Sequence, residues 1–303
     1  MIAIRHAVKT LVFRSGGHAA RLRAAPPPGL AVLCYHSVRA PGDSGVPFAE
    51  LHVRADRLAA HCRFLAEACA PVSLADVEAS LAGGTALPPA AVLVTFDDGC
   101  RSVLTRALPI LERYRVPALV FACSGTIERQ ELAWYDALAR RSGEAGVAAT
   151  KYLPYDQWIA AVAEVTAPAS PDDPHGPLTV AELQQLAAHP LVTIGAHTVN
   201  HPILASAPRQ VQREEIAASR RALAAWTGQP IDAFAYPNGI PGVDYTPQAV
   251  DLVREAGFRV AFSTRPAFAT PGVERFEQPR FVMLDMPAAE LAHRLAFSWP
   301  RPA

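Results

Sequence analysis

The sequence predicts an α/β fold, because apolar segments of strand length alternate with amphipathic segments of helix length along most of its 303 residues. The segment 91–96 (AVLVTF) is apolar throughout, as in a strand covered on both faces. Residues 54–69 carry apolar side chains at helical spacing, and the same alternation returns between 179 and 264. This pattern indicates a parallel sheet with helices outside it, but periodicity alone does not separate a barrel from a doubly wound sheet.

The first elements follow one another regularly. The proline-rich stretch at 24–29 (AAPPPG) cannot continue a helix, and the apolar run at 30–38 (LAVLCYHSV) is typical of a strand. After the helix and strand already described, a helix at 103–115 contains a proline, and the strand PALVFACS follows it at 117–124.

Residues 127–180 lack the tight alternation of their flanks and contain the loop APASPDDPHGP. We interpret this section as an insertion into the domain. Beyond it the regular order returns. The expected elements are helices at 179–190, 209–228 and 246–257, strands at 191–198, 231–239 and 258–264, and a final segment from 279 onward.

Composition argues against several classes of protein. The 28 basic and 28 acidic residues cancel, so no overall field attracts nucleic acid, and we expect no nucleic-acid partner. The five cysteines form no CxxC pair, which argues against a disulfide framework or a cysteine zinc site. No stretch approaches the roughly 20 apolar residues that cross a bilayer, and the first thirty residues lack a clear signal-peptide core.

Residues 1–23 form a basic amphipathic segment. They mix apolar residues with arginine and lysine and contain no acid, the pattern of a helix that lies on a membrane surface or docks on a partner. Peripheral membrane contact and packing on the chain's own domain fit this pattern equally well. We place this N-terminal segment at 1–29 and the main domain at 30–303. The sequence leaves open whether the chain is soluble or peripheral, and its oligomeric state.

Polar residues stand at the ends of four predicted strands. Loops at the carboxyl ends of parallel strands converge over a rigid scaffold, so catalytic groups collect there. Two adjacent carboxylates repel each other, and a cation, a shared proton or solvent must relieve them. The residues are Tyr35 with His36, Asp97 with Asp98, His197 with His201, and Tyr236 with Asn238.

The two histidines of GAHTVNHP, His197 and His201, are four positions apart, a spacing that brings two imidazoles onto one side of a helical turn. Two imidazoles and one carboxylate, with water completing the shell, form an ordinary open catalytic site for a divalent cation. This set suits zinc, and also cobalt, nickel, manganese or iron. Two unrelated surface histidines are the alternative, but the acid pair at another strand end favours the metal site.

The motifs TFDDG, HTVNH and FAYPNG occur in this order, each after an apolar strand. Together they resemble the NodB-type polysaccharide deacetylases of carbohydrate esterase family four, over roughly residues 30–285. The resemblance implies a distorted barrel of about seven strands with the metal at its carboxyl-terminal mouth and the insertion as a lid. It also implies that Asp98, His197 and His201 hold the metal and that Asp97 is the general base.

The segment LCYHSV is similar to a rearranged subgroup of this family that includes poly-N-acetylglucosamine deacetylases, in which a tyrosine–histidine pair on the first strand supplies the general acid. The resemblance therefore points to His36 as the group that protonates the leaving amine. A structural histidine at a strand end is the alternative. The late histidine of other members is not evident, because the segment around His293 looks helical.

FAYPNG departs from the family's arginine-x-x-proline-tyrosine pattern, with Phe234 at the arginine position and Asn238 at the aromatic one. The backbone N–H after Pro237 can still help to bind an oxyanion, because that role needs no particular side chain. Arg280 is a candidate substitute for orienting the base, with a surface arginine as the alternative. Tyr236 is either a site residue or part of the core.

The insertion bears on the choice of substrate. Trp134 and Trp158 offer aromatic rings on which a sugar can stack, although aromatic residues in such a segment more often form local core. Among the cysteines, Cys100 is a candidate site residue because it lies beside the acid pair. The alternative is that it is a small buried thiol of the core.

We expect a metal-dependent hydrolase that deacetylates N-acetylhexosamine units of a surface polysaccharide or of its lipid-linked precursor. Two alternatives remain. An amidase of the same fold would act on a small or non-glycan amide, since the same groups serve any accessible C–N amide bond. A non-catalytic glycan-binding or assembly factor would retain only the fold, and the complete set of motif residues argues against it.

Overall fold

A computed structural model of the chain describes residues 2–298. Seven parallel strands follow one another in the order β10, β1, β5, β6, β7, β8, β9, and β4 pairs with β5 outside this path. The strands of this sheet are β1 (Ala31–Tyr35), β4 (Ala70–Pro71), β5 (Ala91–Phe96), β6 (Ala118–Ala122), β7 (Val192–Ala196), β8 (Ala233–Ala235), β9 (Val260–Phe262) and β10 (Phe281–Val282). A separate pair joins β2 (Val38–Arg39) to β3 (Val53–Arg54).

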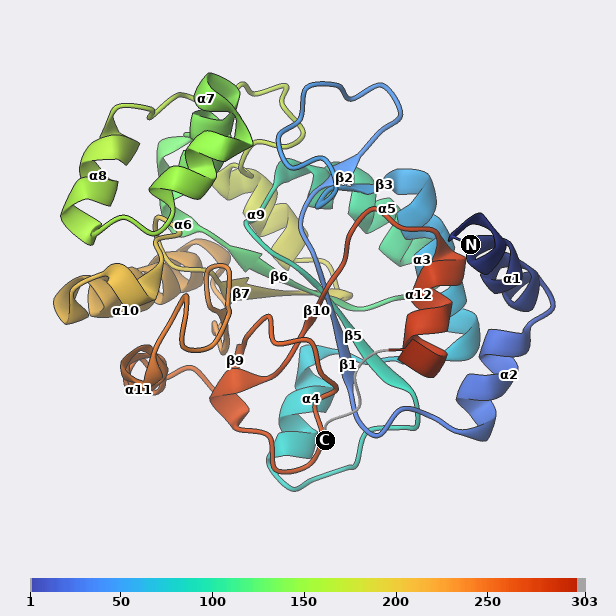
Figure 1. Cartoon of the computed structure of the whole chain (residues 1–303). Coiled ribbons are helices and arrows are strands. Elements are labelled where there is room, and N and C mark those ends of the chain that lie inside the picture. The colour runs from blue at the N-terminus through green and yellow to red at the C-terminus, as the bar shows by residue number, and fades with distance from the viewer. Residues whose placement is uncertain (1, 299–303) are drawn as a thin grey trace.

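The sheet curls into a half-barrel whose two end strands approach each other (Figure 1). The backbone N–H of Ser263, just after β9, donates to the carbonyl of Gln278, just before β10, at 2.9 Å. The expected distorted barrel of about seven strands is therefore confirmed, with parallel pairing throughout the path.

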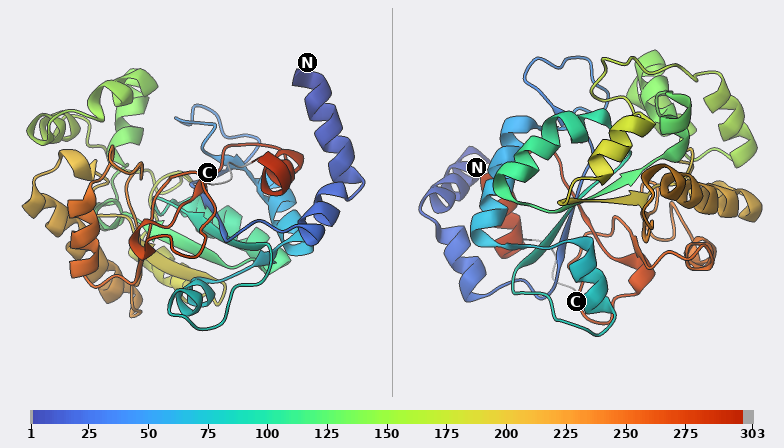
Figure 2. Two further views of the ribbon diagram at one scale, coloured as in Figure 1. Left: turned by 60° about the horizontal axis from the view of Figure 1, so that its bottom comes forward. Right: turned by 180° about the vertical axis from the view of Figure 1, so that it is seen from behind.

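Helices pack on the outside of the strands, and in the view from behind α3, α5, α9 and α10 lie across the back of the sheet (Figure 2). The helices are α1 (Ile2–Arg14), α2 (Gly17–Ala24), α3 (Ala55–Ala68), α4 (Leu74–Leu81), α5 (Leu108–Tyr114), α6 (Ser124–Arg129), α7 (Trp134–Thr150), α8 (Tyr155–Ala163), α9 (Val180–Ala187), α10 (Arg209–Thr227), α11 (Pro247–Glu255) and α12 (Ala288–His293). Short helical turns lie at Val103–Ala107, Leu204–Ser206, Arg275–Glu277 and Arg294–Ser298.

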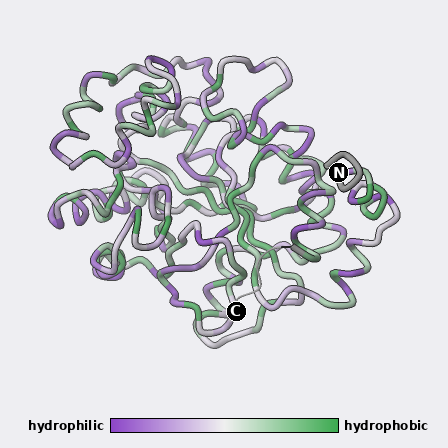
Figure 3. Tube along the Cα trace, viewed as in Figure 1, coloured by the Kyte–Doolittle hydropathy of each residue, from purple (hydrophilic) through white to green (hydrophobic). Residues whose placement is uncertain are grey.

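The central strands are buried on both faces, as their apolar composition predicts. Every residue of β1, β5 and β6 is buried, and apolar residues concentrate along these strands (Figure 3). In-register pairs such as Leu33 with Val94 and Leu33 with Phe281 fix the neighbours of β1. At about 25 cal/mol for each Å² of apolar surface removed from water, this core is the main source of stability.

One helix, α4, is not singled out by the sequence analysis, although its start carries a readable signal. The Ser73 side chain accepts a hydrogen bond from the backbone of Asp76, and the Asp76 carboxylate accepts one from the backbone of Ser73. This reciprocal arrangement is a capping box, and it satisfies two N–H groups that would otherwise lack partners.

The insertion has its own small core. Helices α7 and α8 pack together through Trp134, Trp158 and Val147, and they project to one side of the barrel mouth (Figure 1). The helix α7 is kinked at Gly143, whose φ of 74° lies in the left-handed region. The section that lacks regular alternation therefore contains two helices, α7 and α8, which pack on each other.

The basic N-terminal segment packs on its own domain. Helices α1 and α2 lie against α12 and α3, with an ion pair of 2.7 Å between Lys9 and Glu290 and a ring contact between Phe13 and Phe64. Leu22 is fully buried there. Of the two alternatives for residues 1–23, docking on the domain is the one observed, and membrane contact gains no support. None of the helices among residues 2–298 is long and apolar enough to cross a bilayer.

Candidate active site

The acid pair follows β5 at the carboxyl edge of the sheet, and the backbone sends its two side chains apart. Asp98 has a φ of 75° and Gly99 a φ of 76°. At Gly99 a Cβ atom would come within 3.1 to 3.2 Å of Ala122, so this position combines a left-handed turn with a close approach. Asp97 consequently turns toward the last strand and Asp98 toward β7.

Asp98 meets the two motif histidines. Its Oδ1 atom lies 3.6 Å from His197 Nε2 and 3.7 Å from His201 Nε2, and one ligand atom of each residue lies within 4.8 Å of the others. Within the described part of the chain this buried oxygen has no hydrogen-bond partner. A buried carboxylate oxygen facing two imidazole nitrogens suits a divalent cation, so the three residues fit a metal.

Each of the two histidines has a feature that suits a metal ligand. His197 Nδ1 lies 2.7 Å from the carbonyl oxygen of Ala235, to which it donates, so its Nε2 carries the lone pair. Burial, together with the neighbouring His197, lowers the pKa of His201 to about 3. An uncharged imidazole has a free lone pair for a metal.

The segment between the histidines is not the helical turn that their spacing predicted. Thr198 and His201 have φ values of 65° and 57°, and the Thr198 hydroxyl accepts a hydrogen bond from the His201 backbone at 3.0 Å. The two imidazoles still meet, with ring centroids 4.8 Å apart. A turn with left-handed residues, and not one turn of helix, therefore brings the two imidazoles together.

A residue that the sequence analysis missed holds this turn in place. Glu215 on α10 accepts hydrogen bonds of 2.8 Å from the backbone N–H groups of Val199 and Asn200, and one of 2.6 Å from the Asn200 side chain. The sequence does carry one sign of this role: Glu215 falls on the buried face of α10, between Gln212 and Ile216. A buried carboxylate at such a position needs donors, and here they are the backbone of the ligand turn.

Asp97 is held by Arg280. The two guanidinium nitrogens donate to Asp97 Oδ1 at 2.7 Å and Oδ2 at 2.8 Å, and Arg280 also donates to the carbonyl of Ser263 at 3.0 Å. Burial alone would raise the pKa of Asp97, but the Arg280 charge and hydrogen bonds hold it well below its usual range. Arg280 is fully buried, so the alternative of a surface arginine is wrong.

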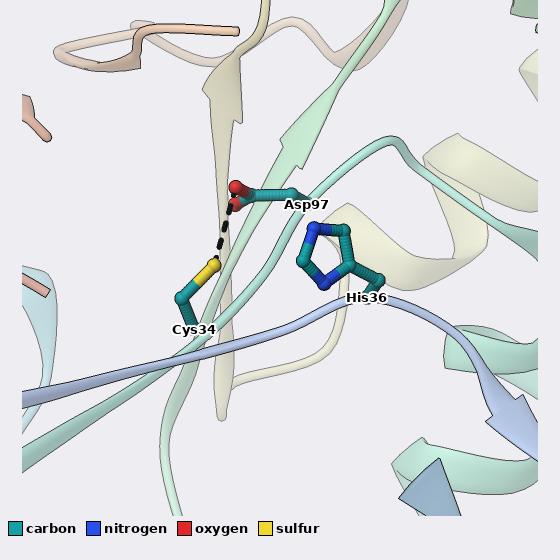
Figure 4. Close-up of side chains that lie close together, drawn as sticks. All are labelled: Cys34, His36 and Asp97. Atoms are coloured by element: carbon teal, nitrogen blue, oxygen red, sulfur yellow. Dashed lines mark hydrogen bonds between the residues drawn. The ribbon is translucent and has the colours of Figure 1, made fainter. Parts of the chain in front are cut away.

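Two residues of β1 and its continuation, Cys34 and His36, approach Asp97 from the other side (Figure 4). The thiol of Cys34 donates to Asp97 Oδ2 at 3.3 Å, and burial raises the pKa of this thiol well above its usual value. His36 faces the same carboxylate, and its buried Nδ1 has no partner among the described residues. Cys34, His36 and Asp97 form a second group of possible metal ligands. Because Arg280 already neutralises the Asp97 carboxylate, this second group needs no metal ion.

Tyr35 lies outside the site. Successive side chains of a strand point to opposite faces, and the Tyr35 hydroxyl lies 3.0 Å from His61 Nδ1 in the core. Tyr236 is likewise fully buried: its ring stacks on Tyr245 at 3.8 Å and its hydroxyl donates to the carbonyl of Phe276. Its side chain does not line the cavity, which favours the core role.

A cavity of about 370 Å³ opens over these groups. Its volume lies at the small end of the range of about 300–1,000 Å³ that is common for ligand sites. One side consists of strand-end residues and the other of α7 and the segment before β3. The lining includes His36, Phe48, Leu51, His52, Asp97, Asp98, Cys100, Trp134, Tyr135, Asp136, Glu144, Val147, Lys151, His197, His201, Asn238 and Thr264.

The remaining predicted residues divide between the cavity and its supports. Asn238 lines the cavity, and its carbonyl accepts a 2.6 Å hydrogen bond from Thr264. Pro237 does not line it, and its carbonyl accepts from Gly239. Trp134 borders the cavity but is only 6% exposed, and its indole N–H donates to the His201 carbonyl at 3.0 Å. Its main contacts are thus structural.

Comparison with known proteins agrees with this geometry. The sequence profile described as polysaccharide deacetylase matches residues 85–261, more than half of the chain. A poly-beta-1,6-N-acetyl-D-glucosamine N-deacetylase of Escherichia coli K12 is 35% identical over 95 residues, which are 31% of this chain and 14% of that protein. The match therefore spans about one seventh of the relative.

Solved structures share the fold. IcaB from Ammonifex degensii has a TM-score of 0.64 at 24% identity, over 89% of this chain and 98% of that chain. The Streptococcus pyogenes deacetylase PplD, solved in complex with acetate, also has a TM-score of 0.64, at 19% identity over 89% of this chain and 99% of that chain. At these identities the likeness establishes the fold.

Proposed function

The chain belongs to the polysaccharide deacetylase family, and from that premise we propose that it is a metal-dependent hydrolase that removes acetyl groups from N-acetylhexosamine units of a surface polysaccharide or of its lipid-linked precursor. One observation carries the proposal. The ligand atoms of Asp98, His197 and His201 converge within 4.8 Å, directly beside a second carboxylate that is kept charged.

Asp98, His197 and His201 would hold the metal, and their mixed nitrogen and oxygen atoms suit zinc, with cobalt, nickel, manganese or iron as alternatives. A bound divalent ion polarises an amide carbonyl and acidifies water. Such help is needed here, because a carboxylate with so low a pKa as Asp97 is a weak base.

Asp97 and His36 divide the proton transfers. The oxygen of the attacking water joins the amide carbon, and its proton passes to Asp97, which Arg280 keeps ionised and correctly oriented. His36 gives a proton to the amide nitrogen as the C–N bond breaks. Acetate and the free amine of the sugar are the products. The backbone N–H of Asn238, after Pro237, is the proposed donor to the oxyanion.

Poly-β-1,6-N-acetylglucosamine is the first glycan to test. The Escherichia coli relative is named as a deacetylase of that polymer. The small cavity, with carboxylate, amide and hydroxyl groups around apolar walls, is also suited to a sugar unit.

The test couples metal analysis to acetate release. The purified chain should hold about one divalent ion, release acetate from N-acetylglucosamine oligomers, lose this activity to a chelator and regain it with added zinc or cobalt. His197→Ala should lose both metal and activity. Turnover of small amides with no glycan accepted would favour the amidase, and metal-free activity would refute the assignment.

A further inference from the structure

One carboxylate in the cavity has no role in the chemistry above. Asp136, in the first turn of α7, lines both the main cavity and a recess of about 20 Å³ beside it. Within residues 2–298 its carboxylate makes no hydrogen bond or ion pair. Asp136 is half-buried and opens on the cavity, so its carboxylate is free to accept hydrogen bonds from a molecule that enters there.

The nearest cation is not a partner for Asp136. Arg140 lies one turn along α7, but its guanidinium donates to Asp173 at 2.6 Å. Two of the other cavity carboxylates have partners, Asp97 in Arg280 and Glu144 in the backbone N–H of Phe48 at 2.8 Å, and the third, Asp98, faces the two motif histidines. Burial, with the Asp98 charge adding to it, raises the pKa of Asp136 to about 7, which agrees with a group that lacks donors.

Asp136 stands next to the metal ligands. The ring of the preceding residue, Tyr135, contacts the His201 ring edge-on at 5.0 Å. Trp134, one residue earlier, fixes the backbone of the same histidine and packs edge-on against Trp158 at 5.7 Å. The start of α7 is therefore anchored to the ligand turn, and this anchoring places the Asp136 carboxylate at a fixed position beside the reacting group.

We propose that Asp136 is a substrate-binding and specificity-determining residue whose carboxylate accepts hydrogen bonds from ring hydroxyls of the N-acetylhexosamine unit that is deacetylated. A neutral sugar ring offers O–H donors and no cation, and a carboxylate binds such donors more strongly than a neutral acceptor does. This inference rests on the proposed function, because it places the acetamido group of the same sugar at Asp98, His197 and His201.

Specificity follows from the cost of leaving Asp136 without a donor. A site built to hydrogen-bond a substrate hydroxyl rejects an analogue that lacks it far more strongly than an apolar pocket rejects a missing methylene. An amide without ring hydroxyls would enter the cavity but leave the carboxylate unpaired, so the inference excludes high affinity for simple acetamides.

The test compares two substrates and two variants. Wild type, Asp136→Leu and Asp136→Asn are assayed on N-acetylglucosamine oligomers and on 4-nitrophenyl acetate, which has an acetyl group but no sugar. Asp136→Leu should lower kcat/KM on the oligomers about 10- to 100-fold and leave the ester unchanged, with Asp136→Asn in between. Asp156→Leu, at an exposed acid of the neighbouring helix α8, is the matched control and should change neither rate.

Deoxy sugars identify the hydroxyl. On the 3-, 4- or 6-deoxy analogue that lacks the bound group, wild type should lose activity while Asp136→Leu loses no more, because the two changes remove the same interaction. Equal losses of Asp136→Leu on oligomer and ester, or no loss on either, would overturn the inference while wild-type glycan activity upheld the proposed function. Wild type that accepts no glycan would refute both.

Discussion

The two walls of the cavity differ in how their polar groups are held. On the wall of strand ends, Asp97 takes two hydrogen bonds from Arg280, and His197 is fixed through its second nitrogen. On the facing wall, formed by α7 and the segment before β3, Trp134 donates to the His201 carbonyl and Phe48 donates to Glu144, but the Asp136 carboxylate has no partner among the described residues. Under the two proposals above, the strand ends carry the chemistry and the inserted helix carries recognition.

The largest effect is expected from a substitution of the proposed base, Asp97, on the wall of strand ends. Asp97→Asn keeps the shape of the side chain but removes the group that accepts a proton, so kcat should fall about 10²- to 10⁴-fold. The metal content should be unchanged, because the ligands are other residues. Acetate release and metal analysis on the same sample measure both. Asp251→Asn, at an exposed acid of α11, is the control. Full activity of Asp97→Asn would show that Asp97 is not the base.

The facing wall, formed by α7 and the segment before β3, is called the recognition wall below. Acid should unfold this wall at a higher pH than the barrel. Burial lowers the pKa of His52 to about 4, and the His52 ring lies 5.2 Å from that of His175, whose pKa is also lowered by burial. His175 joins the insertion to Ser37 at 2.5 Å and to Asp43 at 3.0 Å. Because the folded pKa of His52 lies below its usual 6.5, its contribution is present above pH 6.5 and is lost toward pH 4, by about 3 kcal/mol.

The measurement is limited proteolysis between pH 7 and 4.5, followed together with far-ultraviolet circular dichroism. Cleavage should begin within 127–180 while the helix signal of the barrel persists. His52→Gln cannot take up the proton and should move the onset of cleavage to lower pH. Simultaneous loss of both regions would show that the two walls unfold as one.

The ligand turn is the next point of contrast. Glu215→Ala removes the acceptor for two backbone N–H groups, so metal affinity should fall about 10- to 100-fold, as is typical for residues that orient metal ligands. Glu214→Ala changes the neighbouring exposed acid and is the matched control. Competition with a chelator measures both affinities, and equal values would show that the turn holds its shape unaided.

The smallest effect is expected at the hydrogen bond that joins the two parts of the recognition wall. Glu144→Ala should raise KM on oligomers about two- to fivefold and leave kcat unchanged, since it frees Phe48 without touching the strand ends. Glu164→Ala, beyond the end of α8, is the control. Steady-state kinetics separate the two parameters, and a lower kcat would place part of the chemistry on this wall.

The same contrast explains what the sequence could predict. At the strand ends, local patterns carry the information: an apolar run, then Asp97, Asp98 and a glycine, identify both the strand and the turn. The pairing of Asp97 with Arg280 was only a candidate, because nothing local joins positions 183 apart. The turn from His197 to His201 was expected to be helical, since the spacing is shared by helices and left-handed turns alike.

The facing wall was predicted less well. The insertion was recognised by its lost alternation, but which side of α7 faces the cavity depends on tertiary packing that periodicity does not encode. Trp134 was a candidate for stacking on a sugar, with local core as the alternative, and nothing in the sequence indicated that its indole donates to the His201 carbonyl. The unpaired Asp136 carries no sequence signal, because a carboxylate in the first turn of a helix is common on exposed helices.

The separation of Asp97 and Arg280 in the chain also determines the stage of folding at which the site can form. During synthesis the acid pair leaves the ribosome long before the last strand does, and domains acquire their packing as their segments emerge. Until Arg280 arrives beside β1, the carboxylate has no counter-ion and its burial is unfavourable. A nascent chain that ends before β10 can therefore contain all three motifs and still lack the ion pair that holds the proposed base, so the site is complete only once the barrel has closed.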